Sequence, residues 1–332
     1  MPSRRDFLKG VAAATVSLQT APTKRREVFI GKRRVKVVDI HGHFIFPEEM
    51  DVVKNTKLAP NISNNVNGQL VLGPLRVQFM DQQGIDLQVL SHQGSWWYEA
   101  DRELARQIIK VQNEPLARWC KANPDRFVGL ASVALQYPGM AADQLDEAVK
   151  NLGLRGVGIG GHAGGEVPST PKYDPFWAKV QELGVLVFIH PVGSENLLKE
   201  NALRGRGDLG NIIGNPLETT FFLSRLIVDG TLDRFPGLKI CGAHAGGYLP
   251  SYLGRLDVAC GVRENANCLN KKHPREYFKQ QILADSMIFS EEGLRHLVAE
   301  MGVGQIVYGT DIPYNWPAPV DLILGASFLK DS

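Results

Sequence analysis

From residue 35 onward, short apolar runs alternate with polar loops and with longer segments of helical period. In one such segment apolar residues recur at Leu104, Ile108 and Val111, the spacing of one helix face, and we expect Pro115 to kink or end that helix. A later helix is predicted to begin after the N-capping residue Ser290. Eight apolar runs have the length of buried strands, at residues 35–40, 87–90, 127–135, 156–160, 185–189, 238–242, 282–284 and 306–308.

Continuous apolar strands that alternate with helices indicate a parallel sheet covered by helices. Eight such units predict an α/β fold, a (β/α)8 TIM barrel, rather than an open doubly wound sheet. A dinucleotide-binding sheet is also disfavoured, because no G-x-G-x-x-G follows the first strand. Residues 47–74 are rich in asparagine and glycine and too long for an ordinary loop, so we expect a small insertion over the barrel mouth.

The charge of the chain is unevenly distributed. The first 34 residues hold nine Lys and Arg against two Asp and Glu, whereas the rest has 28 basic and 33 acidic residues. A mildly acidic body argues against nucleic-acid binding, which needs clustered positive charge. No apolar run approaches the roughly 18 residues that span a bilayer, so we expect no membrane span.

The first segment has the order of an export signal. Arg4 and Arg5 precede a weakly apolar stretch at residues 11–18, which is typical of the twin-arginine pathway. We therefore expect residues 1–30 to be a signal that directs export to the periplasm, and residues 31–332 to form a single barrel domain. The alternative is a basic disordered tail on a cytoplasmic protein.

The cysteines lack the spacing of a redox or zinc motif. No C-x-x-C pair occurs, and a chain of 332 residues needs no disulfide framework. Buried free thiols are therefore the favoured interpretation of Cys120, Cys241, Cys260 and Cys268.

Four of the eight histidines stand where predicted strands end, and an aspartate occupies a fifth such position. In a parallel barrel the chemistry lies at these strand ends. His41 and His43 are two residues apart on one strand, so their side chains point the same way. With His190 and Asp311 they would supply three imidazole nitrogens and one carboxylate oxygen to a divalent ion. A lone histidine is more often a core or surface residue, but unrelated histidines have no reason to gather at one rim.

Two further histidines follow predicted strands. His92 and His162 come after the second and fourth strands. They either line the barrel mouth, beside the ligands or the substrate, or are ordinary loop residues. Both interpretations remain open from the sequence.

A series of motifs runs in a fixed order between about residues 37 and 315. They are D-I-H-G-H (39–43), M-D-Q-Q-G-I (80–85), R-F-V-G-L (126–130), P-L-E-T-T (216–220), R-F-P (234–236), A-H-A-G-G (243–247) and G-T-D-I-P (309–313). In this order the chain resembles the amidohydrolase superfamily. Within it, the motifs are similar to those of the branch that contains aminocarboxymuconate semialdehyde decarboxylase and the metal-dependent aromatic-acid decarboxylases.

The resemblance implies roles for individual residues. His41, His43, His190 and Asp311 would be the metal ligands, usually around zinc, and His244 would be the catalytic histidine. Arg255 would reach the substrate carboxylate, in the family often across a dimer interface, and we therefore expect a homodimer. The alternative interpretation of Arg255 is that it forms an ion pair at the surface. Many two-metal members carry a bridging lysine at the end of the fourth strand, and none stands there in this sequence, which favours one ion.

The sequence also departs from that branch. Asn211 takes the place of a tryptophan among the substrate-contacting positions, which implies a different substrate. Only 21 residues follow Asp311, where the family usually adds further helices, so we expect a shortened C-terminus.

Three functions are consistent with these residues. The leading prediction is a metal-dependent carboxy-lyase that acts on a small unsaturated or aromatic carboxylic acid, with His244 delivering a proton to the carbon that loses carbon dioxide. The alternative is a hydrolase of the same superfamily that attacks a lactone or an amide with metal-activated water, while His244 or Asp311 shuttles protons. The third is a non-catalytic metal-binding protein.

Overall fold

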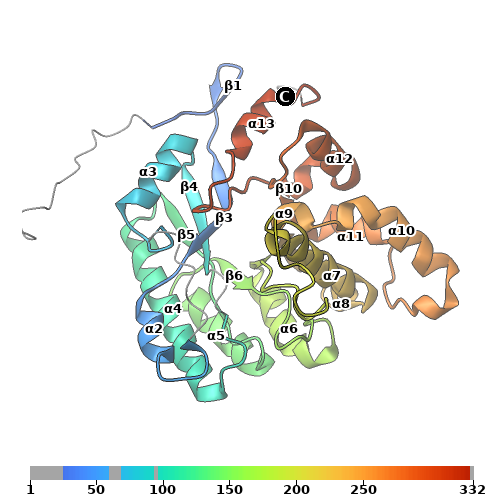
Figure 1. Ribbon diagram of the computed structural model, residues 1–332, viewed down its shortest axis with the longest axis horizontal. Helices are drawn as coiled ribbons and strands as arrows, with labels where there is room; N and C mark the ends of the chain where they lie inside the picture. Colours follow the sequence, from blue (N-terminus) through green and yellow to red (C-terminus); the bar gives the residue numbers. More distant parts are fainter. Residues whose placement is uncertain (1–24, 60–68, 93–95, 330–332) are drawn as a thin grey trace, which may run out of the picture.

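Eight parallel strands form the centre of the molecule and match the eight predicted runs. The computed structural model describes residues 25–59, 69–92 and 96–329, so residues 1–24 of the expected export segment and residues 60–68 of the expected insertion lie outside the described residues. Figure 1 shows the strands surrounded by helices. The strands are β3 (Val38–Phe44), β4 (Leu87–His92), β5 (Phe127–Gly129), β6 (Gly156–Ile159), β7 (Leu186–Ile189), β8 (Lys239–Gly242), β9 (Ile282–Asp285) and β10 (Ile306–Val307).

The strands close into a ring. Hydrogen-bonded neighbours run in the orders β3-β4-β5 and β6-β7-β8-β9-β10, and the pairs within each group are parallel. Ala131 bridges to Val157 on one side, and Gly42 bridges to Ile312 on the other. On that second side the backbone N–H of His43 donates to the carbonyl of Ile312 at 2.8 Å. These links confirm the predicted TIM barrel, and we call the junction of β3 with residues 308–312 the seam.

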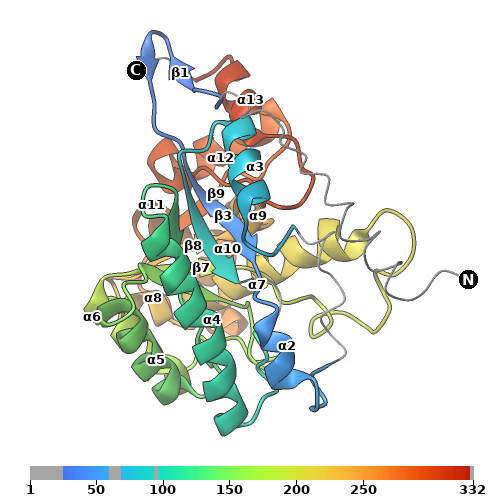
Figure 2. The ribbon, with the colours of Figure 1, turned by 90° about the vertical axis from the view of Figure 1, so that its left-hand side faces the viewer.

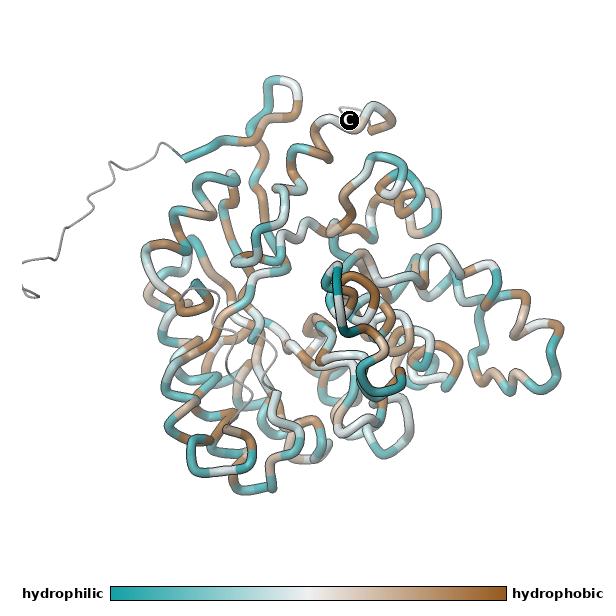
Figure 3. The backbone as a smooth tube through the Cα atoms, viewed as in Figure 1, coloured by the Kyte–Doolittle hydropathy of each residue, from teal (hydrophilic) through white to brown (hydrophobic). Residues whose placement is uncertain are grey.

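Helices cover the outside of this ring. Figures 2 and 3 show the helices α3, α4, α5 and α6 around the strands, with hydrophilic and hydrophobic turns alternating along them. The inward faces of the helices bury large side chains against the strands, such as Phe176 and Trp177 on α6. The helices are α2 (Glu48–Val53), α3 (Pro74–Gln83), α4 (Arg102–Ala122), α5 (Pro138–Lys150), α6 (Asp174–Leu183), α7 (Asn215–Val228), α8 (Thr231–Arg234), α9 (Ala243–Gly246), α10 (Leu249–Val262), α11 (Pro274–Gln280), α12 (Glu291–Met301) and α13 (Pro319–Gly325).

Two local expectations about helices have different outcomes. Ser290 caps α12 as predicted, because its hydroxyl accepts a hydrogen bond from the backbone N–H of Gly293 at 3.1 Å. Of the two outcomes expected at Pro115, a kink or an end of the helix, the end is not found, because α4 continues through Pro115 to Ala122. Within the described residues, no helix is long and apolar enough to cross a membrane.

The fold begins a few residues before the expected boundary at residue 30. A short hairpin pairs β1 (Phe29–Ile30) with β2 (Arg33–Arg34), and Val28 is buried beside it. Both Arg25 and Arg34 donate hydrogen bonds to the carboxylate of Asp86, directly before β4. These contacts fasten the first described residues to the barrel.

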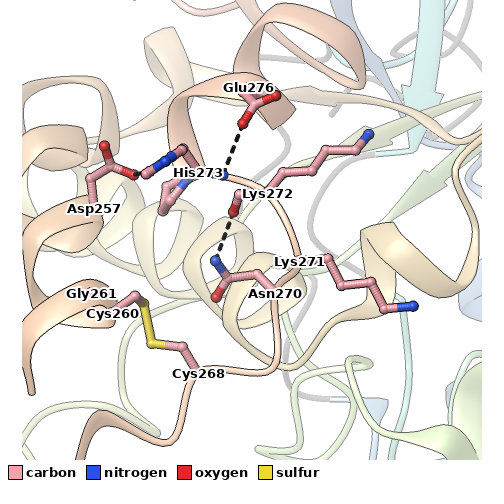
Figure 4. Close-up of a pocket in the computed structure, with 10 residues that line it drawn as sticks. Asp257, Cys260, Gly261, Cys268, Asn270, Lys271, Lys272, His273 and Glu276 are labelled. Atoms are coloured by element: carbon pink, nitrogen blue, oxygen red, sulfur yellow. Dashed lines mark hydrogen bonds and ion pairs between the residues drawn. A yellow bond between two sulfur atoms is a disulfide. The ribbon is translucent and has the colours of Figure 1, made fainter. Parts of the chain in front are cut away.

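The cysteine expectation is wrong for two of the four residues. Cys260 at the end of α10 and Cys268 form a disulfide across an exposed loop. Figure 4 shows this bond beside a cavity of about 410 Å³ that Lys271 and His273 also line. The two cysteines are eight positions apart in the sequence, and the turn that follows α10 brings their Cα atoms to 5.6 Å. Free thiols remain at Cys120 and Cys241.

Candidate metal centre

The four predicted ligands meet at one rim of the barrel. His41 and His43 lie on β3, His190 follows β7, and Asp311 follows β10. One ligand atom from each residue can be chosen so that all four lie within 4.8 Å of one another, and all four side chains are buried. The carboxyl ends of parallel strands share one rim, which is why residues up to 270 positions apart converge here.

The atoms of this cluster fit a divalent cation. Nε2 of His41 lies 2.9 Å from Nε2 of His43, and Oδ1 of Asp311 lies 3.3 Å and 3.0 Å from those two nitrogens. These spacings are close to the roughly 3.3 Å edge of a tetrahedron with bonds of about 2.0–2.1 Å. Oδ1 of Asp311 is buried, and among the described residues it faces these two imidazole nitrogens without a hydrogen bond of good geometry. A buried carboxylate oxygen facing imidazole nitrogens is a site that needs a cation.

The charges of the metal-free cluster point to the same need. Burial opposes protonation of His41, but the carboxylates of Asp311 and Asp285 outweigh it and raise its pKa to about 10. Burial lowers the pKa of His43 to about 4. Although burial opposes its ionisation, the two imidazoles hold the pKa of Asp311 well below its usual range. Without a metal, the cluster therefore keeps one positive charge beside an ionised carboxylate.

Asp285, at the end of β9, connects two parts of the site. Its Oδ2 accepts from Nδ1 of His41 at 2.6 Å, which leaves Nε2 of that ring facing the cluster. Its two oxygens also accept the backbone N–H groups of His244 at 3.1 Å and Ala245 at 2.8 Å. Both residues have a left-handed backbone, with φ of 55° and 57°, a conformation that costs about 1–3 kcal/mol per residue. Asp285 thus orients one ligand and supports the strained turn that carries His244.

Two tryptophans contact the ligands His190 and Asp311. Nδ1 of His190 donates to the carbonyl of Pro191 at 3.1 Å, and the ring of Trp96 stacks beside it with 6.2 Å between centroids. Nε1 of Trp316 donates to Oδ2 of Asp311 at 3.0 Å, so that oxygen is occupied and Oδ1 faces the histidines. Sequence reasoning missed both tryptophans. Trp316 stands five residues after Asp311, in the loop that follows a predicted strand, and that position was the available signal.

His244 lies next to the ligands without belonging to their set. The centroid of its ring is 5.1 Å from that of His190 and 5.4 Å from that of His41. Its Nδ1 is buried and has no hydrogen-bond partner in the described part of the chain. Burial and the neighbouring charge on His41 lower the pKa of this imidazole. The arrangement places a neutral, unengaged imidazole at the edge of the cluster.

The other predicted site residues lie outside the ligand cluster. Arg255 is on the exposed side of α10 and has no ion-pair partner among residues 25–59, 69–92 and 96–329. Asn211 is half-buried in the π-helical turn Gly210–Gly214 that precedes α7. Nδ1 of His162 accepts the backbone N–H of Gly165 at 3.0 Å, and burial lowers the pKa of this half-buried ring. His92 is buried, and its Nε2 lies 2.7 Å from Oε2 of Glu49, which attaches α2 to the end of β4.

Glu218 is buried and connects two loops at the same rim. In the sequence this residue stands out only as part of the P-L-E-T-T motif. The carboxylate of Glu218 on α7 accepts the backbone N–H groups of Gly161 at 3.1 Å, Val192 at 2.9 Å and Gly193 at 2.6 Å. Burial raises its pKa to about 7, although these three donors oppose the shift. Glu218 therefore fastens the loops after β6 and β7, the second of which begins with His190.

The comparisons with known proteins agree with the motifs. The family model described as Amidohydrolase matches residues 38–322, which confirms the resemblance drawn from the sequence. The 2-amino-3-carboxymuconate-6-semialdehyde decarboxylase of Dictyostelium discoideum is 31% identical over 245 residues, covering 72% of this chain and 66% of that protein. The gamma-resorcylate decarboxylase of Rhodococcus jostii is 31% identical over 294 residues, covering 83% of this chain and 88% of that protein.

A solved structure shares the whole architecture. It is a dihydroxybenzoic acid decarboxylase from Polaromonas with bound manganese and the inhibitor 2-nitroresorcinol. The two chains are 27% identical with a TM-score of 0.77, covering 89% of this chain and 92% of that one.

Proposed function

Because the chain belongs to the amidohydrolase family, we propose that it is a metal-dependent decarboxylase that acts on a small aromatic carboxylic acid. The observation that carries this proposal is the cluster of His41, His43, His190 and Asp311 with the unengaged imidazole of His244 at its edge. The names of the relatives support decarboxylation over hydrolysis. An unsaturated aliphatic acid, such as the substrate named for the Dictyostelium relative, is the second substrate class.

Each part of the site has a separate task in this reaction. A divalent ion held by the four ligands supplies Lewis-acid chemistry that polarises the oxygens of the substrate. The bond between the ring carbon and its carboxyl group breaks, carbon dioxide leaves, and the electron pair stays on the carbon. His244, whose imidazole is neutral at rest, takes up a proton from solvent at its second ring nitrogen and delivers that proton to the carbon, which returns the imidazole to its neutral form and balances the reaction. Asp285 keeps His244 in place through the backbone of its turn.

The test is release of carbon dioxide from a panel of hydroxylated benzoic acids and unsaturated dicarboxylic acids. We expect turnover of at least one aromatic acid and its loss in His244→Ala, with metal content unchanged. Turnover of lactones or amides without carbon dioxide release would instead identify the hydrolase. If His244→Ala leaves the detected activity unchanged, the assigned role of this residue is wrong.

For the resident ion we propose zinc. Three imidazole nitrogens and one carboxylate oxygen form a donor set that suits zinc, although the Polaromonas relative is described with bound manganese. Metal analysis of protein purified without added metal tests this proposal. Manganese at one ion per chain would overturn it.

For the assembly we propose a homodimer formed through α10. This helix exposes Tyr252 at 58%, Val258 at 61% and Val262 at 73% of their surface, and Arg255 lies on the same exposed side. Figure 1 shows α10 extending away from the barrel. A second copy would cover this apolar face and would bring Arg255 toward a neighbouring active site, where it would bind the substrate carboxylate. Asn211 and His162 are the proposed contacts to the substrate within the same chain.

Light scattering tests the assembly. We expect twice the chain mass for the wild type and the mass of one chain for Val258→Asp. A wild-type protein of single-chain mass would contradict the dimer.

Export through the twin-arginine pathway is the proposed localisation. The disulfide between Cys260 and Cys268 supports it, because such bonds persist in oxidising compartments. Fractionation of the producing cells tests this directly. We expect the wild type in the periplasm and the Arg4→Lys, Arg5→Lys variant in the cytoplasm; equal distribution of the two proteins would contradict it.

A further inference from the structure

The glycine between the two histidines of β3 leaves space for a neighbouring side chain. A Cβ atom at Gly42 would lie 2.4 Å from Cδ and 2.6 Å from Cγ of Gln88, which is on β4. The register between β3 and β4 shifts between Asp39 and Gly42, at the same place. Gln88 is completely buried and cannot simply turn away. The side chain of Gln88 therefore requires a glycine in the H-G-H motif.

The amide of Gln88 is held at both ends. Its Oε1 accepts from Nη1 of Arg76 at 3.1 Å, and its Nε2 donates to Oδ2 of Asp39 at 2.7 Å. A guanidinium group only donates, so Arg76 fixes which end of the amide faces Asp39. Arg76 is 1% exposed, and its Nη2 also donates to the backbone carbonyl of His43 at 2.5 Å. One end of this network thus touches the backbone of a metal ligand.

The other end reaches across the seam. Oδ1 of Asp39 accepts the backbone N–H groups of His41 and Thr310, each at 3.0 Å. Its Oδ2 accepts the Thr310 hydroxyl at 2.6 Å in addition to the Gln88 amide. All four partners donate, so both carboxylate oxygens are fully used. Thr310 directly precedes Asp311, and Asp39 therefore joins the strand of the paired histidines to the segment of the fourth ligand.

We propose that Arg76, Gln88 and Asp39 form a positioning network that sets the distance between the paired histidines and Asp311 and thereby strengthens metal binding. None of the three contacts the ligand atoms of the cluster. They act through the backbone of His43, the backbone of His41 and the residue before Asp311. The proposal rests on the metal centre of the proposed function and not on the reaction it catalyses.

The first test uses Thr310, where a nearly isosteric change removes the hydroxyl that donates to Asp39 and also accepts, at 3.4 Å, the backbone N–H of Ile312. The affinity of metal-stripped protein for Zn²⁺ is measured by competition with a chromophoric chelator, and the visible absorption of the Co²⁺-loaded protein reports the ligand geometry. We expect Thr310→Val to bind Zn²⁺ about 10–100-fold more weakly and to change the Co²⁺ spectrum. Thr310→Ser keeps the hydroxyl and should bind like the wild type. Equal affinity and an unchanged spectrum in Thr310→Val would overturn the proposal.

The second test is a double-variant cycle on Gly42 and Gln88. Gly42→Ala and Gln88→Ala should each weaken Zn²⁺ binding, because the first displaces the amide that the second removes. The double variant should bind no more weakly than Gln88→Ala alone, since the added methyl group then has space. If the two losses of Zn²⁺ affinity multiply in the double variant, Gly42 does not act on metal binding through Gln88, and the proposal is refuted.

A matched control separates positioning from general stability. Asn113 on α4 is also buried and also joins two elements, because its amide donates to the carbonyl of Ser132 at 2.9 Å and accepts its N–H at 2.8 Å. Asn113→Ala should lower Tm without changing the affinity for Zn²⁺ or the Co²⁺ spectrum. If Asn113→Ala changes the Zn²⁺ affinity and the Co²⁺ spectrum as Thr310→Val does, both variants act through the stability of the fold and the proposal fails. Normal metal binding without carbon dioxide release would contradict only the proposed reaction.

Discussion

Asp285 and His41 are 244 residues apart in the chain, yet the carboxylate of one lies 2.6 Å from Nδ1 of the other, and both side chains are completely buried. The contact determines which nitrogen of His41 faces the metal cluster. Without this carboxylate the ring of His41 could rotate. The backbone N–H groups of the strained turn at His244 would also lose their hydrogen-bond acceptor. Asp285 therefore contacts both the candidate metal site and the turn that carries His244.

Asp285→Asn is predicted to bind metal about 10–100-fold more weakly, because an amide is a poorer acceptor for Nδ1 and its nitrogen opposes a backbone donor. The dissociation constant for Zn²⁺ checks this. Asp257→Asn is the matched control, since Asp257 also pairs with a histidine Nδ1, that of the exposed His273, at 3.1 Å. Wild-type affinity in Asp285→Asn, or equal losses in both variants, would contradict the assigned role.

Metal removal is predicted to lower Tm, because the ion binds the folded chain and not the unfolded one. At a free metal concentration of 100 times Kd this binding contributes about 2.7 kcal/mol. Titration of metal-stripped protein with Zn²⁺ should raise Tm by several degrees, whereas His190→Ala should respond little. His296 is exposed on α12, so His296→Ala should respond like the wild type. An equal response in His190→Ala would show that the ion binds elsewhere.

Glu218 predicts a pH dependence of stability. Burial raises its pKa to about 7 from 4.5, so between these values the folded protein holds a proton that the unfolded chain releases. The proton on Glu218 therefore adds to the unfolding free energy fully below about pH 4.5. This stabilisation, at most about 3 kcal/mol, is lost as pH rises to about 7. Glu218→Gln should lose this part of the pH dependence of the unfolding free energy. Glu292→Gln, at an exposed carboxylate, should keep it, and parallel wild-type and Glu218→Gln curves would refute the prediction.

Reduction of the disulfide is predicted to destabilise the protein. The bond between Cys260 and Cys268 closes a short loop, for which the chain-entropy estimate is about 2–3 kcal/mol. Thermal unfolding of the wild type should therefore shift to lower temperature in the presence of a reductant. The Cys260→Ser, Cys268→Ser variant should unfold at that lower temperature with or without reductant. A further shift of this variant would place the effect elsewhere in the chain.

The sequence predicts the barrel and its metal ligands well because both depend on local rules. Buried parallel strands appear as apolar runs, and the residues after them lie at one rim whatever their separation along the chain. His190 and Asp311 could thus be placed beside the paired histidines without a structure. Ser290 was found as a helix cap for the same reason, since capping depends on a few neighbouring residues.

Other features depend on distances that no local pattern contains. The pairing of Cys260 with Cys268 follows from the turn after α10, and no short spacing motif marks it. Pro115 sits inside a helix whose packing against the barrel outweighs the missing hydrogen bond. The contact of Asp285 with His41 requires β3 and β9 to be placed around the same ring, which only the closed barrel provides.

The seam has a consequence for the order of events during synthesis. The three imidazoles emerge from the ribosome well before Asp311, and the ring has no partner for the free edge of β3 until residues 308–312 are made. A growing chain that lacks this segment therefore has an incomplete set of metal ligands. The fourth ligand therefore arrives on the same segment that closes the ring against β3.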